Sequence, residues 1–259
     1  MNLSIVDLVL LALLFFITSA IGVVTGSNSL ITVPVMFQFG IDPKVAVATN
    51  MFGLTFMAIG ATLPFVKQKA IDYRRVSPLI LLTILGSAIG AGLVGFISDK
   101  TMPIIVSVSM IAVTIFTLIK RDAGVVKSQQ PTSTGGLFSA KNITYILTFL
   151  LGIYGGLYSG GYVTLLTASY VAFFGMTFTE SVASTKLINV FSSSIASVIF
   201  MWQGLVDYKL GAILAVTMFV AAYIGAKTVT KLNDVLLKRI FLATVFLLAI
   251  KTIFDFANK

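Results

Sequence analysis

The chain consists largely of apolar runs, each close to the ~20 residues that an α-helix needs to cross about 30 Å of hydrocarbon. The clearest runs are residues 46–65, 76–97, 103–119, 182–202, 210–226 and 236–254. Hydrophobic residues make up 58% of the 259 positions and charged residues only 10%, against about 25% in soluble proteins. This pattern predicts an all-α polytopic membrane protein. We expect it to lie in the lipid bilayer of the cell inner (plasma) membrane.

Missing residue types exclude several kinds of chemistry. The chain has no Cys and no His, so it has no disulfide, no thiolate metal site, no Ser–His triad and no HExxH zinc site. It has no Walker A loop, and its nine acidic residues lie near helix ends or in loops. We therefore expect no cofactor, no metal, no enzymatic activity and no Asp/Glu proton relay. The net charge of +9 does not indicate nucleic acid, because the basic residues cluster between apolar runs.

Two apolar stretches are too long for one helix and are interrupted by glycine. Residues 3–39 are interrupted at 22–29, and residues 143–174 at 152–161. Each side of the second interruption has about 13–14 residues, or roughly 20 Å of helix, which is short of a crossing. We expect a pair of short helices in each stretch. No basic residue precedes the first stretch, so we expect it to belong to the mature protein rather than to a signal peptide.

The two halves of the chain resemble each other at an offset of about 135 residues. The matches are residues 46–50 with 182–186, 71–73 with 206–208, 90–91 with 225–226, and the two glycine interruptions with each other. This predicts two transmembrane repeats, at residues 1–121 and 142–259, which are joined by a cytoplasmic linker at 122–141.

Basic residues indicate which loops face the cytoplasm. The loops at residues 67–75, 120–141 and 227–239 hold 12 of the 18 basic residues, so the positive-inside rule places them in the cytoplasm. The basic loop at Asp72 corresponds to a neutral loop at Asp207, which makes the repeats inverted. An inverted repeat needs an odd number of elements in each half. We therefore predict five helical elements in each half, with both termini external.

Inverted repeats with broken helices are a recurrent plan of secondary transporters, in which the substrate binds where the breaks meet. Helix N-termini at the breaks would expose N–H groups that attract anions. The Ser and Asn residues there have an alternative role as ordinary helix caps. Tyr154, Tyr158 and Tyr162 recur every four residues, where they either line the cavity or anchor the chain at the interface. The candidate binding residues at the breaks are Gly26, Ser27, Asn28, Ser29, Tyr158, Gly160 and Gly161.

Lys186 is the most informative charge, because a charged side chain within a span is costly and usually functional. It shares a helix face with Asn189 and Ser193, and its match in the first half is Asn50. An ammonium group with amides and hydroxyls suits a small oxyanion. The alternative is a lysine that snorkels to the cytoplasmic interface. The candidate binding residues in these spans are Thr49, Asn50, Thr185, Lys186, Asn189 and Ser193.

Four short motifs resemble the sulfite exporter TauE/SafE family, also called the 4-toluene sulfonate uptake permease family. Two lie in the first half, Leu-Ile-Thr-Val-Pro at 30–34 and Ala-Thr-Asn at 48–50. The other two are similar motifs in the second half, Ser-Gly-Gly at 159–161 and Ser-Thr-Lys at 184–186. The resemblance covers essentially the full length and implies transport of small sulfur-containing anions such as sulfite, sulfonates or sulfoacetate. Asn50 and Lys186 stand where the family usually has Ser.

The leading interpretation is a secondary transporter of small, sulfur-containing anions that works by alternating access. Its substrate would be held between the two broken-helix motifs near the bilayer centre. The alternative is an anion channel or a uniporter for another small inorganic anion, since channels use the same basic and hydroxyl groups. The expected partners are a small anion and lipid, with no nucleic acid. The sequence leaves both a monomer and a homodimer open.

Overall fold

The computed structural model describes residues 3–26, 28–119, 140–231, 236 and 239. All regular structure in these residues is α-helical, as predicted. The predicted linker up to residue 139 and most of the predicted span at 236–254 lie outside them. The helices are α1 (Ile5–Thr25), α2 (Ser29–Gln38), α3 (Pro43–Lys67), α4 (Tyr73–Val94), α5 (Met102–Ile119), α6 (Ala140–Leu157), α7 (Tyr162–Phe173), α8 (Phe178–Trp202) and α9 (Tyr208–Val229).

Among the described helices, α1, α3, α4, α8 and α9 are long and apolar enough to cross a membrane. Each begins at a side-chain cap, provided by Ser4, Asp42, Asp72, Thr177 and Asp207 respectively. Helix α8 begins four residues before its predicted start at 182, because Thr177 and Glu180 form a capping box that hydropathy does not register. Helix α6 likewise begins at Ala140, inside the predicted linker.

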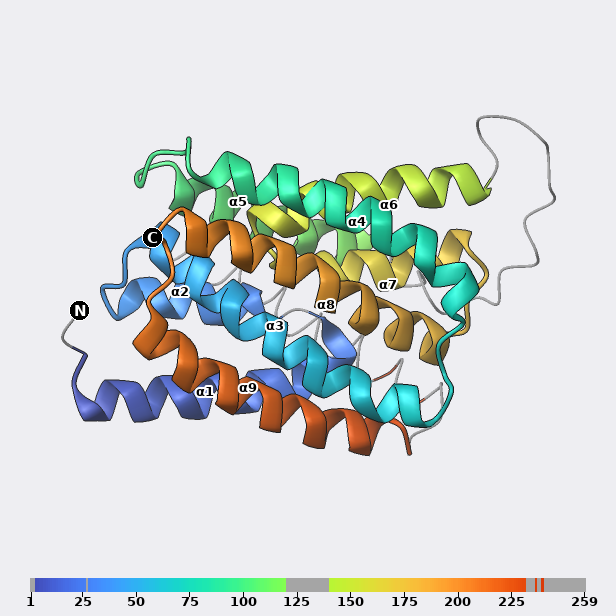
Figure 1. The fold of residues 1–259 in the computed structure, drawn as a ribbon, viewed down its shortest axis with the longest axis horizontal. Helices are drawn as coiled ribbons and strands as arrows, with labels where there is room; N and C mark the ends of the chain where they lie inside the picture. Colours follow the sequence, from blue (N-terminus) through green and yellow to red (C-terminus); the bar gives the residue numbers. More distant parts are fainter. Residues whose placement is uncertain (1–2, 27, 120–139, 232–235, 237–238, 240–259) are drawn as a thin grey trace.

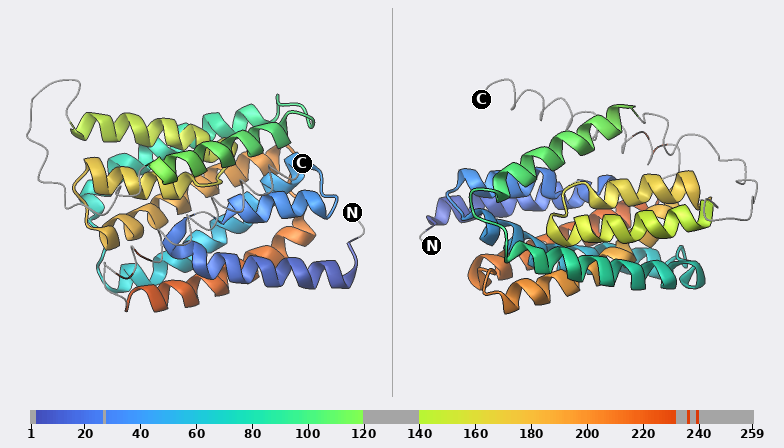
Figure 2. Two further views of the ribbon diagram at one scale, coloured as in Figure 1. Left: turned by 180° about the vertical axis from the view of Figure 1, so that it is seen from behind. Right: turned by 90° about the horizontal axis from the view of Figure 1, so that it is seen from above.

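Helices α2 and α7 have only 10 and 12 residues, or about 15 and 18 Å of length. Figure 2 shows α2 running back toward the end of the bundle where α1 begins, and α7 toward the end where α6 begins. The segments α1–α2 and α6–α7 are therefore helical hairpins with their tips inside the bundle. The expectation of short helices on both sides of each break is wrong for α1 and α6, which have 21 and 18 residues.

Helix α6 is longer than predicted because its glycines pack against a neighbour instead of breaking the helix. A Cβ at Gly152 would lie 3.3 Å from the backbone of Thr83 on α4, and one at Gly156 would strike the Ser87 carbonyl. Gly86 and Gly90 on α4 face the backbone of α6 in the same way. Small residues let helix backbones approach closely in membranes. These glycines are therefore packing residues inside α6, and the helix ends one residue after Gly156.

Turn conformations recur at a fixed spacing of 135 positions. The described residues with positive φ are Gly26 and Gly161 (68° and 77°), Gly40 and Gly175 (72° and 63°), and Lys69 and Gly204 (54° and 70°). Helices α3 and α8, with 25 residues each, also begin 135 positions apart. This spacing corrects one predicted match. Asn50 corresponds to Thr185, and Lys186 corresponds to Met51.

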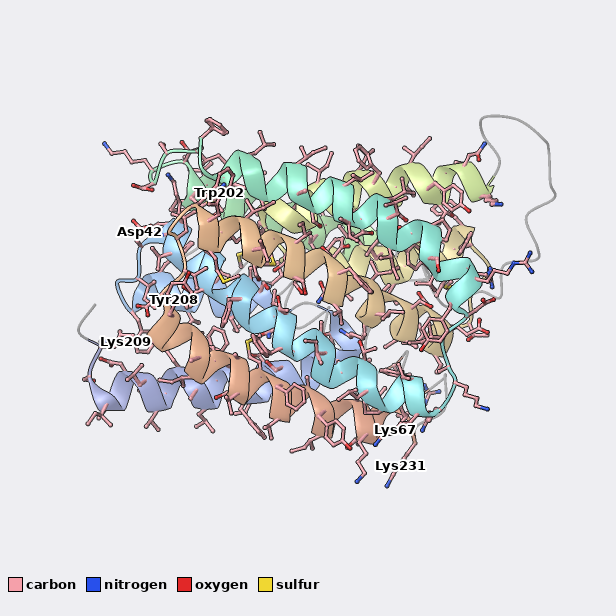
Figure 3. All side chains as sticks on the ribbon, viewed as in Figure 1. Asp42, Lys67, Trp202, Tyr208, Lys209 and Lys231 are labelled. Carbon is pink, nitrogen blue, oxygen red and sulfur yellow. The ribbon has the colours of Figure 1, made fainter. Side chains whose placement is uncertain are left out.

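The two halves interleave. Helix α1 packs against α9, α6 packs against α4, and α3 and α8 pack against each other. Figure 1 shows α1 with α9 along one edge, α4 with α6 along the other, and α3 and α8 between them. Lys67 and Lys231 lie at one end of the bundle, and Asp42 and Tyr208 at the other (Figure 3). The loop after α3 and the loop before α9 are therefore at opposite ends.

Candidate functional site

The tips of the two hairpins meet inside the bundle. The Thr164 hydroxyl donates to the carbonyl of Thr25 at 2.6 Å, and the Tyr158 hydroxyl donates to the carbonyl of Ser29 at 3.0 Å. The hydroxyls of Ser29 and Ser159 lie 2.7 Å apart. Each contact joins residues about 130 positions apart in sequence. The structure therefore brings the two predicted breaks together.

A small cavity lies at this junction. Five of its lining residues were predicted as site residues: Gly26, Asn28, Ser29, Lys186 and Asn189. The others are Gly22, Leu54, Met57, Ser159 and Val163. The centres of water molecules have about 20 Å³ available in it. About 10–15 Å³ suffices for one water, so the cavity holds roughly one water and is smaller than an oxyanion with several heavy atoms.

Lys186 points into the bundle rather than toward an interface. Its side chain is 3% exposed, and its Nζ donates to the Gly22 carbonyl at 2.9 Å. Gly22 lies in the last turn of α1, where the negative end of the helix dipole favours a cation. Among the described residues, the ion pair is Lys44 with Asp99 at 3.2 Å, and no acid pairs with Lys186. A buried cation without a counter-charge is costly, so this position favours an anionic ligand.

Neutral polar groups surround the ammonium group. The Asn28 amide nitrogen donates to the Ser19 hydroxyl at 3.1 Å, while its Oδ1 is buried with no partner in the described part of the chain. Because a hydroxyl both donates and accepts, Ser19 satisfies either orientation of this amide. The Asn189 side chain also lines the cavity and forms no hydrogen bond with another described residue. The Asn28 amide nitrogen also donates to the Met57 sulfur at 3.3 Å, so the Asn189 amide is the one available to bind a ligand.

Two helices begin at the tips, and their N-cap residues do not cap them. Asn28 at α2 and Gly161 at α7 make no side-chain cap, in contrast to the five capped helices described above. Side-chain capping by Asn28, the alternative role for this residue, is therefore absent. Ser27 lies outside the described residues. Helix N–H groups without a cap attract anions, which adds to the chemistry of Lys186.

Other predicted residues support the hairpins without lining the cavity. Asn50 donates to the Ser29 hydroxyl at 2.9 Å and accepts from the Thr32 hydroxyl at 2.8 Å. The hydroxyls of Thr167 and Thr185 lie 3.2 Å apart, at positions 135 later than Thr32 and Asn50. Each pair joins the short helix of a hairpin to the long central helix that follows it.

Thr49 and Ser193 are directed elsewhere. The Thr49 hydroxyl accepts from the backbone N–H of Asp207 at 3.0 Å, and the Ser193 hydroxyl donates to the Asn189 carbonyl at 2.5 Å. The structure does not bring either residue to the cavity lining.

The tyrosines lie at the second tip. Tyr154 donates to the Gly160 carbonyl, so Gly160 is held beside the tip although it does not line the cavity. Tyr158 and Tyr162 are both fully buried among protein side chains, which excludes a role as interface anchors. The Tyr162 hydroxyl has no hydrogen-bond partner among the described residues.

Two helical hairpins whose tips meet at a polar cavity inside a membrane protein form an arrangement that recurs in membrane transporters. Comparison with known proteins defines the family. The model of the family "Sulfite exporter TauE/SafE" matches residues 11–252, so the chain belongs to this family.

Three relatives are similar over nearly their whole length. A "probable membrane transporter protein" of Haemophilus influenzae is 26% identical over 95% of each chain. The "probable membrane transporter protein ORF9" of a Sinorhizobium species is 26% identical over 95% of this chain and 93% of its own. The "probable membrane transporter protein YfcA" of Escherichia coli K12 is 24% identical over 98% and 93%. No solved structure matches the chain. The protein is a multi-pass membrane transporter and not an enzyme, as predicted.

Proposed function

We propose that this protein is a secondary transporter of small oxyanions, including sulfur-containing ones such as sulfite and organosulfonates. One observation carries the proposal: the Lys186 ammonium lies beside the cavity, buried, with no acid paired to it among the described residues. A bound anion would supply the missing counter-charge. The amide N–H groups of Asn189 and one hydroxyl of the Ser29–Ser159 pair would donate to its oxygens. The family name supports the choice of sulfur anions.

The two halves form an inverted repeat in this proposal, and transport proceeds by alternating access. The recurrence of turns at 135 positions and the opposite positions of the Lys67 and Tyr208 ends support the inversion. One hairpin enters the bundle from each end, and the cavity lies where they meet. Movement of one hairpin against the other would open the site to one side at a time. The small cavity fits a contracted state that must widen to admit substrate.

Flux into proteoliposomes tests the proposal. Uptake would be measured for sulfite, thiosulfate, sulfate, methanesulfonate and chloride, with wild-type protein, Lys186→Met and Lys209→Met. A charge-assisted contact is worth about 1.5–3 kcal/mol, so Lys186→Met should weaken the apparent affinity roughly 10- to 150-fold. Lys209→Met, at an exposed lysine near one end of the bundle, should leave it unchanged.

Two outcomes would contradict the proposal. Unchanged affinity in Lys186→Met would move the site away from α8. Flux that does not saturate with substrate concentration would indicate a channel instead of a carrier.

A further inference from the structure

The net charge of the cavity is the sum of the charges on the side chains that line it. Lys186 contributes one positive charge, and no other charged residue in the described part of the chain lines the cavity. Asn28, Ser29, Ser159 and Asn189 offer donors and acceptors but no net charge. No described acidic residue is buried. The side chains that line the cavity therefore carry a net charge of +1 when Lys186 is protonated.

The helix dipoles do not add to this charge. Each hairpin tip carries the C-terminal end of one long helix and the N-terminal end of one short helix. At the first tip α1 ends at Thr25 and α2 begins at Ser29; at the second, α6 ends at Leu157 and α7 begins at Tyr162. A helix terminus is equivalent to roughly half a charge, positive at the N-terminus and negative at the C-terminus. The two signs offset each other at each tip, although the N–H groups still donate hydrogen bonds.

We propose that the site selects oxyanions with a single negative charge over dianions of the same shape. This inference rests on the proposed function, because it concerns the ligand of the same site. A monoanion bound next to Lys186 leaves the buried site neutral. A dianion leaves one uncompensated negative charge in a bundle interior that offers no second cation among the described residues. Burying an unpaired charge in such surroundings carries a large desolvation penalty.

Separate binding titrations with two tetrahedral ions, each with four oxygens, test this selection. Perchlorate carries one negative charge and sulfate carries two. Purified full-length protein in detergent would be titrated with each ion, and the ratio of the two dissociation constants would be recorded. We expect perchlorate to bind about 100-fold more tightly than sulfate to the wild-type protein, because the unpaired charge is penalised. Equal binding, or tighter binding of sulfate, would overturn the inference.

Perchlorate is also less strongly hydrated than sulfate, so a variant that changes only the charge of the site is needed. Asn189 lines the cavity one helical turn after Lys186 and has a free amide. Asn189→Lys should raise the relative affinity for sulfate at least about 10-fold, because a second ammonium group matches the second negative charge. Asn189→Gln is the neutral control and should leave the ratio unchanged. Because the ratio is measured on the folded fraction, partial unfolding of a variant does not change it.

The failure of this inference is distinguishable from the failure of the proposed function. If sulfate binds wild-type protein as tightly as perchlorate and Lys186→Met weakens both, the anion site stands and charge selection is wrong. If the ratio is the same in Asn189→Lys and Asn189→Gln, hydration and not the charge of the site sets the preference, and charge selection is again wrong. If neither ion binds and none of the tested anions is transported, the proposed function is wrong and this inference falls with it.

Discussion

The two halves of this transporter share a backbone plan but differ in chemistry. Gly26 and Gly161 have the same left-handed conformation, 135 positions apart, at the two hairpin tips. Yet Lys186 in the second half corresponds to Met51 in the first, which is only 2% exposed. A repeated scaffold thus builds two equivalent hairpins, while one side chain in one copy gives the cavity its charge.

The ends of the bundle differ in a similar way. At the end that carries Lys67, the Arg75 guanidinium donates to the Phe174 carbonyl and lies 4.7 Å from the centre of the Phe174 ring. The corresponding positions at the other end hold Leu210 and Phe39. Among the described residues, Arg75 on α4 therefore contacts the end of α7, while the corresponding position near the end of α2 holds the apolar Leu210.

The largest expected effect concerns the orientation of the two halves. Tyr73 and Tyr208 occupy corresponding positions at opposite ends of the bundle and are 53% and 58% exposed. The chain has no native Cys, so Tyr73→Cys and Tyr208→Cys give single labelling sites. An impermeant thiol reagent added outside should label Tyr208→Cys and should reach Tyr73→Cys only after the membrane is permeabilised, because basic loops stay in the cytoplasm. Labelling of both from one side would rule out inversion.

The second effect concerns the contact between the hairpin tips. A Cβ at Gly26 would lie 2.8 Å from the backbone nitrogen of Thr164, whereas a Cβ at Gly40 would meet nothing within 4 Å. Both glycines have positive φ, which costs a residue with a side chain about 1–2 kcal/mol. Gly40→Ala should lose only that amount. Gly26→Ala adds overpacking of about 1–3 kcal/mol and should abolish transport.

Thermal unfolding in detergent and flux in proteoliposomes would measure both variants. If Gly26→Ala and Gly40→Ala lose the same stability and both transport normally, the tips are not in close contact during function.

The sequence predicted most of the helices, because hydropathy and capping residues are local signals. Asp72 and Asp207 each precede a helix that begins at the next residue. The exact ends of α1 and α6 were missed, because a glycine that packs against a neighbouring helix and a glycine that breaks a helix look alike in sequence. Contacts with α4 keep Gly152 within α6.

The same contrast between local and non-local signals applies to the candidate site. Lys186 stood out because a charge in an apolar run is visible in the sequence. Its contact with the carbonyl of Gly22 was not predictable, because a backbone acceptor carries no sequence signal. The match of Asn50 with Lys186 was wrong by one position. The spacing of Asp72 and Asp207, applied strictly, would have paired Asn50 with Thr185.

The third effect compares the two polar pairs that hold the short helices. Asn50 bonds both Ser29 and Thr32, whereas Thr185 has one side-chain partner, Thr167. A hydrogen bond between membrane helices is worth about 0.6 kcal/mol on average and up to about 1.7. Asn50→Ala should therefore destabilise the protein by roughly 1–3 kcal/mol, and Thr185→Val by about half of that. Thermal unfolding of the two variants gives the comparison, and a larger loss for Thr185→Val would contradict it.

The smallest expected effect concerns the arginine at one end of the bundle. A cation–π contact is worth about 0.5–2 kcal/mol, so Arg75→Leu should favour local opening near Phe174 by about 1 kcal/mol, or roughly 5-fold. Met176 follows Phe174 by two residues and is 4% exposed, and Ile41 is its counterpart at the other end, 2% exposed. The labelling rate of Met176→Cys should rise about 5-fold when Arg75→Leu is added, because the buried thiol is reached only through opening. The rate for Ile41→Cys should not change. An equal rise at both positions would mean that Arg75 stabilises the whole bundle, and no rise at either would mean that its contact with Phe174 does not hold this end closed.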